Sequence, residues 1–407
     1  MEKTHFYGYT DKSALDYKVN EPITFTVYPA ENKKLAQRKD IIYYKWQITG
    51  DDDRCEEGYI NVKETLVPLV LTTRLSRAGF VRVIVEACDG NKNPLPDIVR
   101  FEGGAGVDIK NIELATKIPD DFDKFWTEIM EDVNNTDISR AETTETNGEK
   151  GYRTYKIKIP APYGKPAQGI LTIPEKDGKY PAKIQFCGYG VSKTIPVYEK
   201  DVISLVINAH GIEPDAPQEY YDNLAQEPDG EIFYYGFDNI ENSNPHTCYF
   251  KGMMARDLIA SRFIRTLPQW NKINLTATGG SQGALQAVTV AAHDENITML
   301  DISIPWLCNL GGYKDKWKFY YGRIKGWAPD YTLGISYFDT AVQATKVKCP
   351  ARIMARLGDY TCPPSGIMAL YNGLNTEKEI SFRQNGTHGY DSPDCEVYTL
   401  NDKNRLA

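Results

Sequence analysis

Short apolar runs separated by helical stretches are the feature of this 407-residue sequence that most restricts its fold. From about residue 151 onward these runs are PAKIQF, VISLVIN, INLTATG, MLDISIPW and ARIMARLG. Apolar strands that alternate with amphipathic helices are typical of a parallel sheet covered by helices on both faces. Before them, YRTYKIKIPA and QGILTIP alternate like a hairpin, and PDDFDKFWTEIMEDV has the period of a helix. The sequence therefore predicts a mostly parallel α/β sheet.

The first hundred residues instead contain strand patterns and almost no helical period. The β-branched and aromatic runs are EPITFTVYPA, IIYYKWQIT, TLVPLVLTTRL and GFVRVIVEACDGNKNP, and clusters of turn-forming residues separate them. Such strands pack most simply as a small all-β sandwich. We therefore expect a sandwich-like domain over residues 1–110 and an α/β domain over residues 111–407, with the glycine-rich segment 101–111 as the connection.

Composition and charge exclude several classes of protein. The chain is 41% hydrophobic and 25% charged, which is typical of a globular protein, and its formal net charge is −8. This acidic balance gives no electrostatic reason to expect a nucleic acid or a membrane surface as partner. No apolar run approaches the roughly 18 residues of a membrane span, and the first residues contain no apolar signal region. We expect a cytoplasmic protein if the chain is complete as given, and a periplasmic or secreted one if a signal peptide has been removed.

The eight cysteines are scattered, and none forms a CxxC pair. This spacing argues against a zinc site and favours free thiols in a reducing cytosol. We expect neither a metal nor another cofactor.

One short motif indicates chemistry. In NLTATGGSQGALQAV, residues 274–288, Ser281 lies between Gly279 and Gly283, after an apolar strand and before a helical run. A nucleophile at such a turn adopts a strained backbone conformation, and tiny neighbours let the helix approach the strand closely. A glycine-rich turn without chemistry has the same appearance, so the motif alone is weak evidence.

A serine nucleophile needs a base, and five histidines are available. His388, in NGTHGYD, follows the apolar run EISFRQ, which is where an α/β-hydrolase sheet places its base. His210 follows the run VISLVIN and is expected to border the site. We expect His5 among the N-terminal strands, His246 in a solvated or capping role, and His293 as a partner of a helix dipole.

The acid and the oxyanion donors are expected at the same sheet edge. Asp359, in ARIMARLGDYTCPPSG, follows a buried run, which gives the chain order Ser281, Asp359, His388 of α/β-hydrolases. Taken alone, Asp359 also fits an ordinary turn residue. The backbone N–H of Gln282 is one natural oxyanion donor, and the amide of Tyr189, in the loop after PAKIQF, is expected to be the second.

Several segments resemble one known family. ATGGSQGALQAV, SIPWLCNL, GDYTCPPSGIMALYNGL and NGTHGY are similar to segments of the acetyl xylan esterase and cephalosporin C deacetylase family, carbohydrate esterase family seven. The resemblance spans roughly residues 160–389. It implies an α/β-hydrolase that removes acetyl groups from short acetylated sugars. The residues it assigns are the nucleophile Ser281, the acid Asp359, the base His388 and the oxyanion donors Tyr189 and Gln282.

The chain departs from this family in three places. Residues 187–189 read Cys-Gly-Tyr where the family usually has His-Gly-Tyr, which leaves a backbone amide donor in place. Residues 210–212 read His-Gly-Ile where the family has Arg-Gly-Gln, so substrate contacts differ there. His210 and Trp306 are the candidates for substrate contact. The N-terminal β-domain is absent from the basic family enzyme, and we expect it either to mediate oligomer contacts or to narrow the mouth of the site.

Residues 211–244 and 311–337 are long, aromatic and weakly periodic, which favours loops or a lid over one sheet edge. Their aromatic side chains either stack on sugar rings or form the core of the lid. Together with Trp306, the residues concerned are Tyr220, Tyr221, Phe233, Tyr234 and Tyr235.

The predicted function is a serine carbohydrate esterase that hydrolyses acetyl esters of xylo-oligosaccharides or related sugars. An acetylated carbohydrate is then the expected partner. The sequence leaves open whether the protein forms a homo-oligomer. Two alternatives stay open. One is an esterase for bulkier hydroxycinnamoyl groups on plant polysaccharides, and the other is a carbohydrate-binding protein on a hydrolase scaffold that has lost catalysis.

Overall fold

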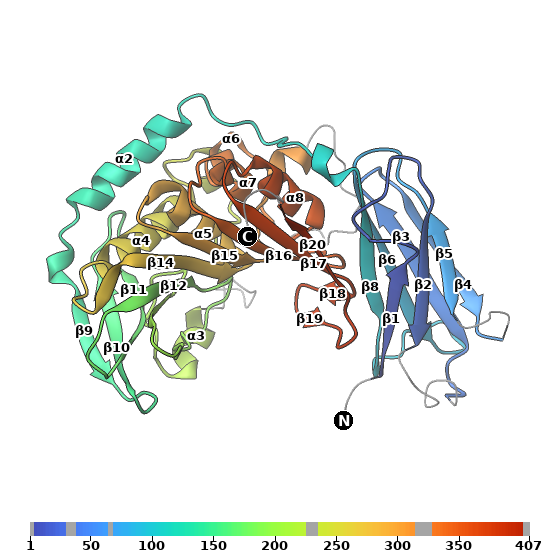
Figure 1. Cartoon of the computed structure of the whole chain (residues 1–407), viewed down its shortest axis with the longest axis horizontal. Coiled ribbons are helices and arrows are strands. Elements are labelled where there is room, and N and C mark those ends of the chain that lie inside the picture. The colour runs from blue at the N-terminus through green and yellow to red at the C-terminus, as the bar shows by residue number, and fades with distance from the viewer. Residues whose placement is uncertain (1–3, 30–37, 64–67, 225–234, 314–327, 402–407) are drawn as a thin grey trace.

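The computed structural model describes residues 4–29, 38–63, 68–224, 235–313 and 328–401. An N-terminal β region and a larger α/β region lie side by side along the long axis of the molecule (Figure 1). Within the described residues, no helix is both long and apolar enough to cross a membrane.

The N-terminal region forms two four-stranded sheets in the described part of the chain. The first has the order β5-β2-β1-β7, with β1 (Thr4–Thr10), β2 (Ile23–Pro29), β5 (Leu69–Thr73) and β7 (Ile98–Val99). The second has the order β4-β3-β6-β8, with β3 (Tyr43–Gly50), β4 (Cys55–Asn61), β6 (Gly79–Cys88) and β8 (Phe101–Val107). Phe6, Phe25, Phe80 and Phe101 are buried among these strands. The predicted all-β character of this region is confirmed.

The prediction of a glycine-rich connection at residues 101–111 was wrong. Residues 101–107 form β8, whose side chains are all buried and which pairs antiparallel with β6. A short 3-10 helix, η1 (Ile109–Asn111), follows. The glycines here make room for neighbours, because a Cβ on Gly103 would overlap Gln384 and one on Gly106 would overlap Ile109. A count of glycines does not distinguish close packing from a flexible connection.

The α/β region contains a ten-stranded sheet in the described residues, in the order β20-β17-β16-β15-β14-β12-β13-β11-β10-β9. The six strands from β17 to β13 in this order run parallel, and the strands outside them pair antiparallel. The predicted mostly parallel α/β-hydrolase sheet is therefore confirmed. Its strands are β9 (Glu142–Thr146), β10 (Tyr152–Ile159), β11 (Ala167–Pro174), β12 (Tyr180–Phe186), β13 (Ile203–Ile207), β14 (Trp270–Gly280), β15 (Met299–Ser303), β16 (Ala351–Arg356), β17 (Lys378–Arg383) and β20 (Val397–Asn401).

Helices α4, α5, α7 and α8 pack against one another in that order, α4, α5 and α8 also pack against the sheet, and α2 packs on α4 (Figure 1). The predicted helix near residue 122 is α2, with five buried residues at helical spacing. The described helices are α2 (Phe122–Asn135), α3 (Gln218–Leu224), α4 (Tyr249–Ile264), α5 (Gln282–His293), α6 (Leu333–Ser336), α7 (Thr340–Ala344) and α8 (Pro364–Gly373), with the 3-10 turns η2 (Ile138–Arg140), η3 (Glu241–Ser243) and η4 (Leu310–Tyr313).

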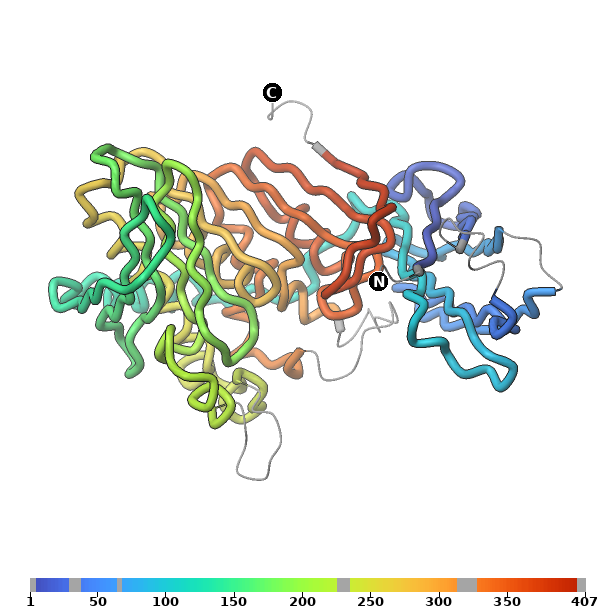
Figure 2. Tube along the Cα trace, turned by 90° about the horizontal axis from the view of Figure 1, so that it is seen from below, coloured from blue at the N-terminus to red at the C-terminus, as the bar shows by residue number. Residues whose placement is uncertain are grey.

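Complete burial of both sheet faces holds for only some strands. All residues of β11 and β13 are buried, but those of β12, β15 and β16 alternate between buried and partly or fully exposed. Figure 2 shows the strands of this sheet side by side, with the N-terminal region next to the strands from the C-terminal part of the chain. The outward side chains of these strands include Lys183, Asp301 and Arg352. Lys183 pairs with Glu199 at 2.5 Å, and Arg352 lies 3.7 Å from Asp301. We expected helices to cover both faces of the sheet, and this expectation fails at these strands. In such short apolar runs the few polar residues do not reveal the alternation between a buried and an exposed face.

Candidate active site

Ser281 occupies the sharp turn between β14 and α5. Its backbone angles are φ 56° and ψ −120°, a region that a residue with a Cβ rarely adopts. A Cβ on Gly279 would overlap the backbone of Gly283, and one on Gly283 would overlap the backbone of Phe186 in β12. The two glycines are therefore needed because helix and strands meet there without room for a side chain. The turn has the geometry that presents a nucleophile.

The loop after β15 fixes this turn from the other side. The N–H of Ser281 donates to the carbonyl of Ser303 at 3.0 Å, and the N–H of Trp306 donates to the carbonyl of Ser281 at 3.2 Å. The hydroxyl of Thr340 holds the Trp306 carbonyl at 2.5 Å. Three residues of this loop have positive φ angles, namely Ile304, Leu307 and Asn309. The backbone of Ser281 is thus held by a second segment, the loop after β15, which is itself strained.

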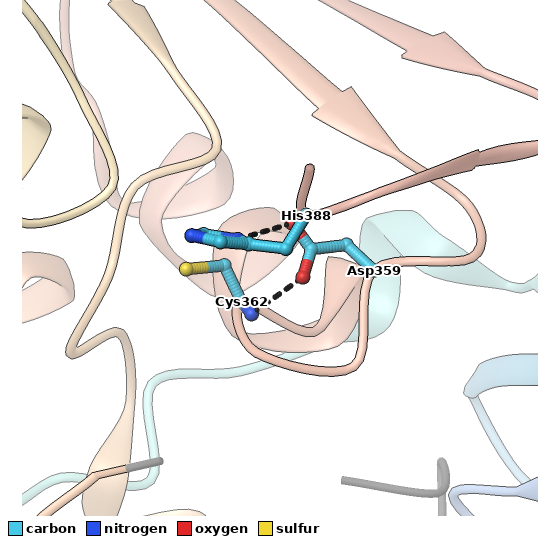
Figure 3. A group of neighbouring side chains, drawn as sticks. All are labelled: Asp359, Cys362 and His388. Carbon is cyan, nitrogen blue, oxygen red and sulfur yellow. Dashed lines mark hydrogen bonds and ion pairs between the residues drawn. The ribbon is translucent and has the colours of Figure 1, made fainter. Parts of the chain in front are cut away.

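Asp359 and His388 form a hydrogen-bonded pair after β16 and β17 (Figure 3). The Nδ1 atom of His388 lies 3.0 Å from Oδ2 of Asp359, and the carboxylate is fully buried. The other carboxylate oxygen accepts from the N–H groups of Thr361 and Cys362, each at 2.9 Å. Three partners therefore fix this acid, and Figure 3 shows the second ring nitrogen of His388 pointing away from it.

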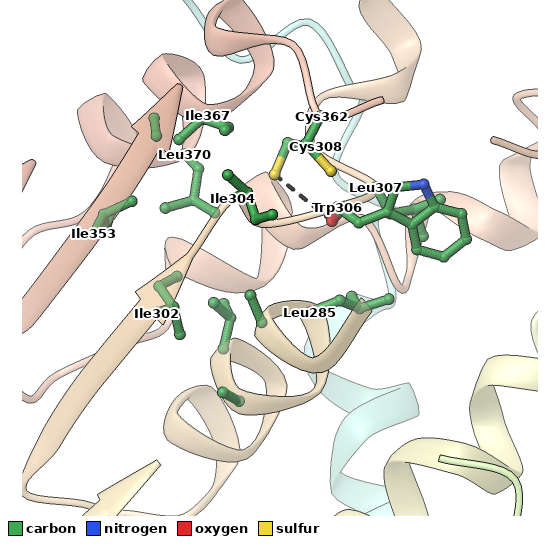
Figure 4. Close-up of a cluster of buried hydrophobic side chains, with 14 of the residues drawn as sticks. Leu285, Ile302, Ile304, Trp306, Leu307, Cys308, Ile353, Cys362, Ile367 and Leu370 are labelled. Atoms are coloured by element: carbon green, nitrogen blue, oxygen red, sulfur yellow. Dashed lines mark hydrogen bonds between the residues drawn. The ribbon is translucent and has the colours of Figure 1, made fainter. Parts of the chain in front are cut away.

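An apolar layer beneath these loops supports the serine and the acid together (Figure 4). Leu285 on α5, Ile302 on β15, Ile353 on β16 and Leu370 on α8 are almost fully buried. Each such aliphatic side chain stabilises the fold by roughly 1.5–3 kcal/mol. The same core thus positions the strand ends that carry Ser281 and Asp359.

Arg356 holds the hairpin that carries His388, which consists of β18 (Gly386–Thr387) and β19 (Tyr390–Asp391). Its Nη1 donates to the His388 carbonyl at 2.9 Å, and its Nε lies 2.7 Å from Oδ1 of Asp391. Arg383 also contacts Asp391, at 2.6 Å, but no bond to the His388 carbonyl is recorded for it among the described residues. Sequence reasoning did not find Arg356, because its partners lie over thirty residues away.

Ser281 and His388 line one cavity of about 650 Å³. They are not hydrogen-bonded to each other within the described part of the chain; such bonds often shorten only when substrate binds. Apolar walls come from Trp306, Phe237 and Ile195. Further lining residues, which the sequence did not indicate, are Asn208, Lys193, Ser192 and Thr361.

The two expected oxyanion donors lie after neighbouring parallel strands. Phe186, at the end of β12, is opposite Gly279 of β14, and Tyr189 lines the cavity in the loop after β12. Gln282 is the first residue of α5, where a backbone N–H has no acceptor inside the helix. The Nε2 atom of Gln286 donates to the Cys187 carbonyl at 2.8 Å, which ties this loop to α5.

His210 is not among the residues that line this cavity. It is buried behind Tyr189, stacks on Tyr235 with a centroid distance of 4.4 Å, and its Nδ1 lies 2.6 Å from the Tyr249 hydroxyl. Burial, together with the charges of Arg256 and Lys165, lowers the pKa of His210 to about 3, so the ring is neutral. Its expected place in direct substrate contact was wrong, whereas Trp306 does line the cavity.

The other histidines lie away from the cavity. His293 ends α5, stacks on Trp126 at 4.1 Å and contacts Gln343 through Nε2 at 2.7 Å. His293 lies in the last turn of α5, as predicted, but burial lowers its pKa to about 4, so its ring is neutral there. His246 is exposed in a turn, and His5 contacts Asp394 at 2.7 Å.

Of the predicted aromatic residues, Tyr220 and Tyr221 pack against each other, and the Tyr221 hydroxyl donates to the Glu213 carbonyl. Both lie on the short helix α3, so the segment predicted as a loop over residues 211–244 contains a helix. Phe233 and Tyr234 lie outside the described residues. Phe237, which the sequence did not single out, stacks on Trp306 with a centroid distance of 5.9 Å.

A cluster with metal-ligand chemistry coincides with the acid and base. Ligand atoms of Asp359, Cys362 and His388 all lie within 4.8 Å of one another. Because His388 and Asp359 already bond to each other, a bound ion would have to replace that bond. The donor set therefore fits an acid–base pair better than an ion site.

A parallel sheet with a serine at a strained turn and an Asp–His pair on two further strand ends defines an α/β-hydrolase. The sequence profile of the acetyl xylan esterase (AXE1) family matches residues 107–323 and 326–401, and the chain belongs to this family. The match begins at the last residue of β8.

Individual proteins that are similar to this chain are acetyl esterases and acetyl xylan esterases. Acetyl esterase Axe7A from Xylanibacter ruminicola is 28% identical over 278 residues, which covers 65% of this chain and 62% of that protein, less than two thirds of its length. The acetyl xylan esterase from Paenibacillus sp. R4 aligns with a TM-score of 0.56 at 22% identity, covering 69% of this chain and 93% of that one. Acetyl xylan esterase 1 from Thermoanaerobacterium sp. JW/SL YS485 aligns with a TM-score of 0.57 at 17% identity, covering 70% of this chain and 93% of that one. These two structures support the fold.

Proposed function

We propose that this protein hydrolyses acetyl esters of xylo-oligosaccharides or related acetylated sugars through Ser281, His388 and Asp359. The observation that carries the proposal is the buried Asp359–His388 hydrogen bond beside the strained Ser281 turn, in one cavity. The family of the chain and the acetyl esterase activity of its relative Axe7A support an acetyl ester as substrate.

In the first step, the free nitrogen of His388 removes the proton of Ser281, whose oxygen attacks the acetyl carbonyl carbon. The backbone amides of Gln282 and Tyr189 stabilise the negative oxygen that forms. His388 then gives the proton to the sugar oxygen as the C–O bond breaks, which leaves an acetyl group on Ser281. Water repeats the sequence, with His388 as base, and releases acetate.

Asp359 acts on this cycle by fixing His388. Its fully buried carboxylate accepts from the Nδ1 side of the ring, which directs the other nitrogen toward the cavity and stabilises the ring when it carries the extra proton. The two backbone bonds to the acid hold it in place throughout.

The cavity walls fit a sugar ring better than a long apolar chain. Trp306 and Phe237 present aromatic surface, while Asn208 and Lys193 supply polar groups that can meet hydroxyls. Its volume of about 650 Å³ exceeds what an acetyl group alone requires, so the sugar shares it.

The test measures acetate release from acetylated xylo-oligosaccharides, with Ser281→Ala beside the native protein. We expect the variant to lose roughly 10³-fold or more in kcat while its circular dichroism is unchanged. Ser139→Ala, on the exposed turn η2, is the matched control and should keep native activity.

Three outcomes would contradict the proposal. Near-native activity of Ser281→Ala would reject the nucleophile. Faster release of ferulate than of acetate from matched esters would favour the hydroxycinnamoyl alternative. Binding of acetylated oligosaccharides without any release would favour the carbohydrate-binding alternative.

A further inference from the structure

The segment just before the His388 hairpin is bound by the N-terminal region. Gln384 is fully buried, its Nε2 donates to the Gly104 carbonyl at 2.9 Å, and its Oε1 accepts from the Gly104 N–H at 2.8 Å. Gly104 belongs to β8, the edge strand of its sheet. The amide therefore pairs with an edge-strand residue much as a neighbouring strand would.

Asn385 makes a second pair of bonds to the same region. Its Nδ2 donates to the Phe6 carbonyl at 2.7 Å, and its Oδ1 accepts from the Glu102 N–H at 3.1 Å. Asn385 is 3% exposed and has a positive φ of 54°, a left-handed conformation that asparagine adopts more readily than most residues. These two side chains thus connect β1 and β8 to the segment three residues before His388.

β8 also packs against the loop that carries Asp359. A Cβ on Gly103 would overlap Gln384, and a Cβ on Gly358 would overlap the carbonyl of Glu102. The N–H of Gly358 donates to the Gly386 carbonyl at 2.9 Å, which joins the acid loop to the hairpin. The N-terminal strand thus contacts both loops that lead to the Asp359–His388 pair.

Charged groups extend this contact. Glu102 pairs with Arg82 in a buried ion pair and with Arg100 at 2.5 Å. The Arg82 guanidinium lies 5.0 Å from the ring centroid of Tyr360, the residue after Asp359. Breaking one partner of a buried ion pair is costly, so this pair holds β8 against β6, the strand whose Arg82 lies over the ring of Tyr360.

We propose that Gln384 and Asn385 are positioning residues, through which the N-terminal domain fixes His388 in line with Asp359 and Ser281. The inference rests on the proposed function, because it assumes that His388 is the base. Neither amide is among the lining residues described for the cavity, so their effect passes through the hairpin. Displacement of a catalytic group by about 1 Å can lower a rate by about 100-fold.

The first test replaces the two amides. Gln384→Ala and Asn385→Ala should each lower kcat on an acetylated xylo-oligosaccharide by roughly tenfold. KM should stay within about twofold, because the cavity walls do not change. The downfield proton signal of the Asp359–His388 hydrogen bond should broaden or shift in both variants.

The second test compares two glycines of β8. Gly103→Ala places its methyl group against Gln384 and the Phe101 ring, whereas Gly106→Ala places it against Ile109 and Phe80 inside the N-terminal domain. Both should lower the melting temperature, but only Gly103→Ala should lower kcat. In the double variant Gly103→Ala/Gln384→Ala, kcat should be no lower than in Gln384→Ala, because the two changes act through one contact.

The result that would overturn the inference is a native kcat and a native proton signal in Gln384→Ala, Asn385→Ala and Gly103→Ala, with only stability reduced. Should Gly103→Ala fail to fold, the two amide variants decide by the same criteria. Failure of the proposed function is a separate result, since only that failure leaves Ser281→Ala active.

Discussion

Two parts of the candidate site are built in opposite ways. The Ser281 turn is held by its own neighbours in sequence and by the adjacent strands, through glycines and backbone hydrogen bonds. The His388 hairpin is held by Arg356, which is 32 residues away in the sequence, and by Gln384 and Asn385, whose partners lie in the N-terminal region. The nucleophile is thus fixed within one domain, whereas the base depends on contacts between two.

This difference predicts how each part fails. Changes near Ser281 should act on folding first, because the turn exists only if strand and helix meet closely. Changes near His388 should act on kcat first, because the hairpin can shift while the sheet stays intact. Four substitutions separate these outcomes, from the largest expected effect to the smallest.

Asp359→Asn should lower kcat by roughly 10⁴-fold while the fold is retained. The oxygen that accepts from Thr361 and Cys362 is kept, but an amide N–H₂ facing His388 selects the wrong tautomer of the ring. Steady-state acetate release measures the loss. Asp301→Asn, on the partly exposed face of β15, should have native kcat, and an equal loss there would reject the assignment of the acid.

Gly283→Ala should destabilise the protein by about 3 kcal/mol or more, because its Cβ would overlap the backbone of Phe186. Urea unfolding measures this free energy. Gly373→Ala, at the end of α8, is the matched control; its Cβ meets Thr345 only at 3.7 Å, so stability should be unchanged or slightly higher. Equal stability of the two variants would contradict the account of a locally built turn.

We expect Asp51 to make the contact between the N-terminal region and α8 dependent on pH. It is fully buried, accepts from the Phe80 N–H at 2.7 Å and lies 3.5 Å from the Ser365 hydroxyl of α8. Burial raises the pKa of Asp51 from its ordinary value of 3.8 to about 7. The folded protein therefore binds this proton more tightly than the unfolded chain does, so the stabilisation is complete below pH 3.8 and is lost as the pH rises to about 7.

Asp51→Asn should remove this dependence. The free energy of unfolding of the variant, relative to that of the native protein, should rise by on the order of 2 kcal/mol from pH 5 to pH 8. Melting temperatures at the two pH values measure it. A constant difference between variant and native protein at both would show that Asp51 is not protonated at this contact.

Arg356→Met should lower kcat roughly tenfold, because the His388 carbonyl loses its partner. Arg383→Met removes a second arginine from Asp391 without touching His388, so its kcat should stay near native. If both variants lost activity equally, the carbonyl bond would not be what positions the hairpin.

Order along the chain was enough to predict Ser281, Asp359 and His388 as neighbours, because parallel strands bring their carboxyl ends to one edge. The burial of His210 and His293 could not be predicted, since it depends on aromatic partners such as Tyr235 and Trp126 from distant segments. β8 was missed because its glycines serve contacts with residues nearly 300 positions away. Local sequence patterns predict helices and strands. They do not reveal hydrogen bonds between side chains that are far apart in the sequence.

The most direct test of the account labels the nucleophile. The native protein is treated with an organophosphate that reacts with activated serines, and tryptic peptides are mapped by mass spectrometry while acetate release is followed. The account predicts one label per chain, on Ser281, in proportion to the activity lost, and none in Ser281→Ala. Full activity with Ser281 labelled, or loss of activity through a label on another residue, would contradict it.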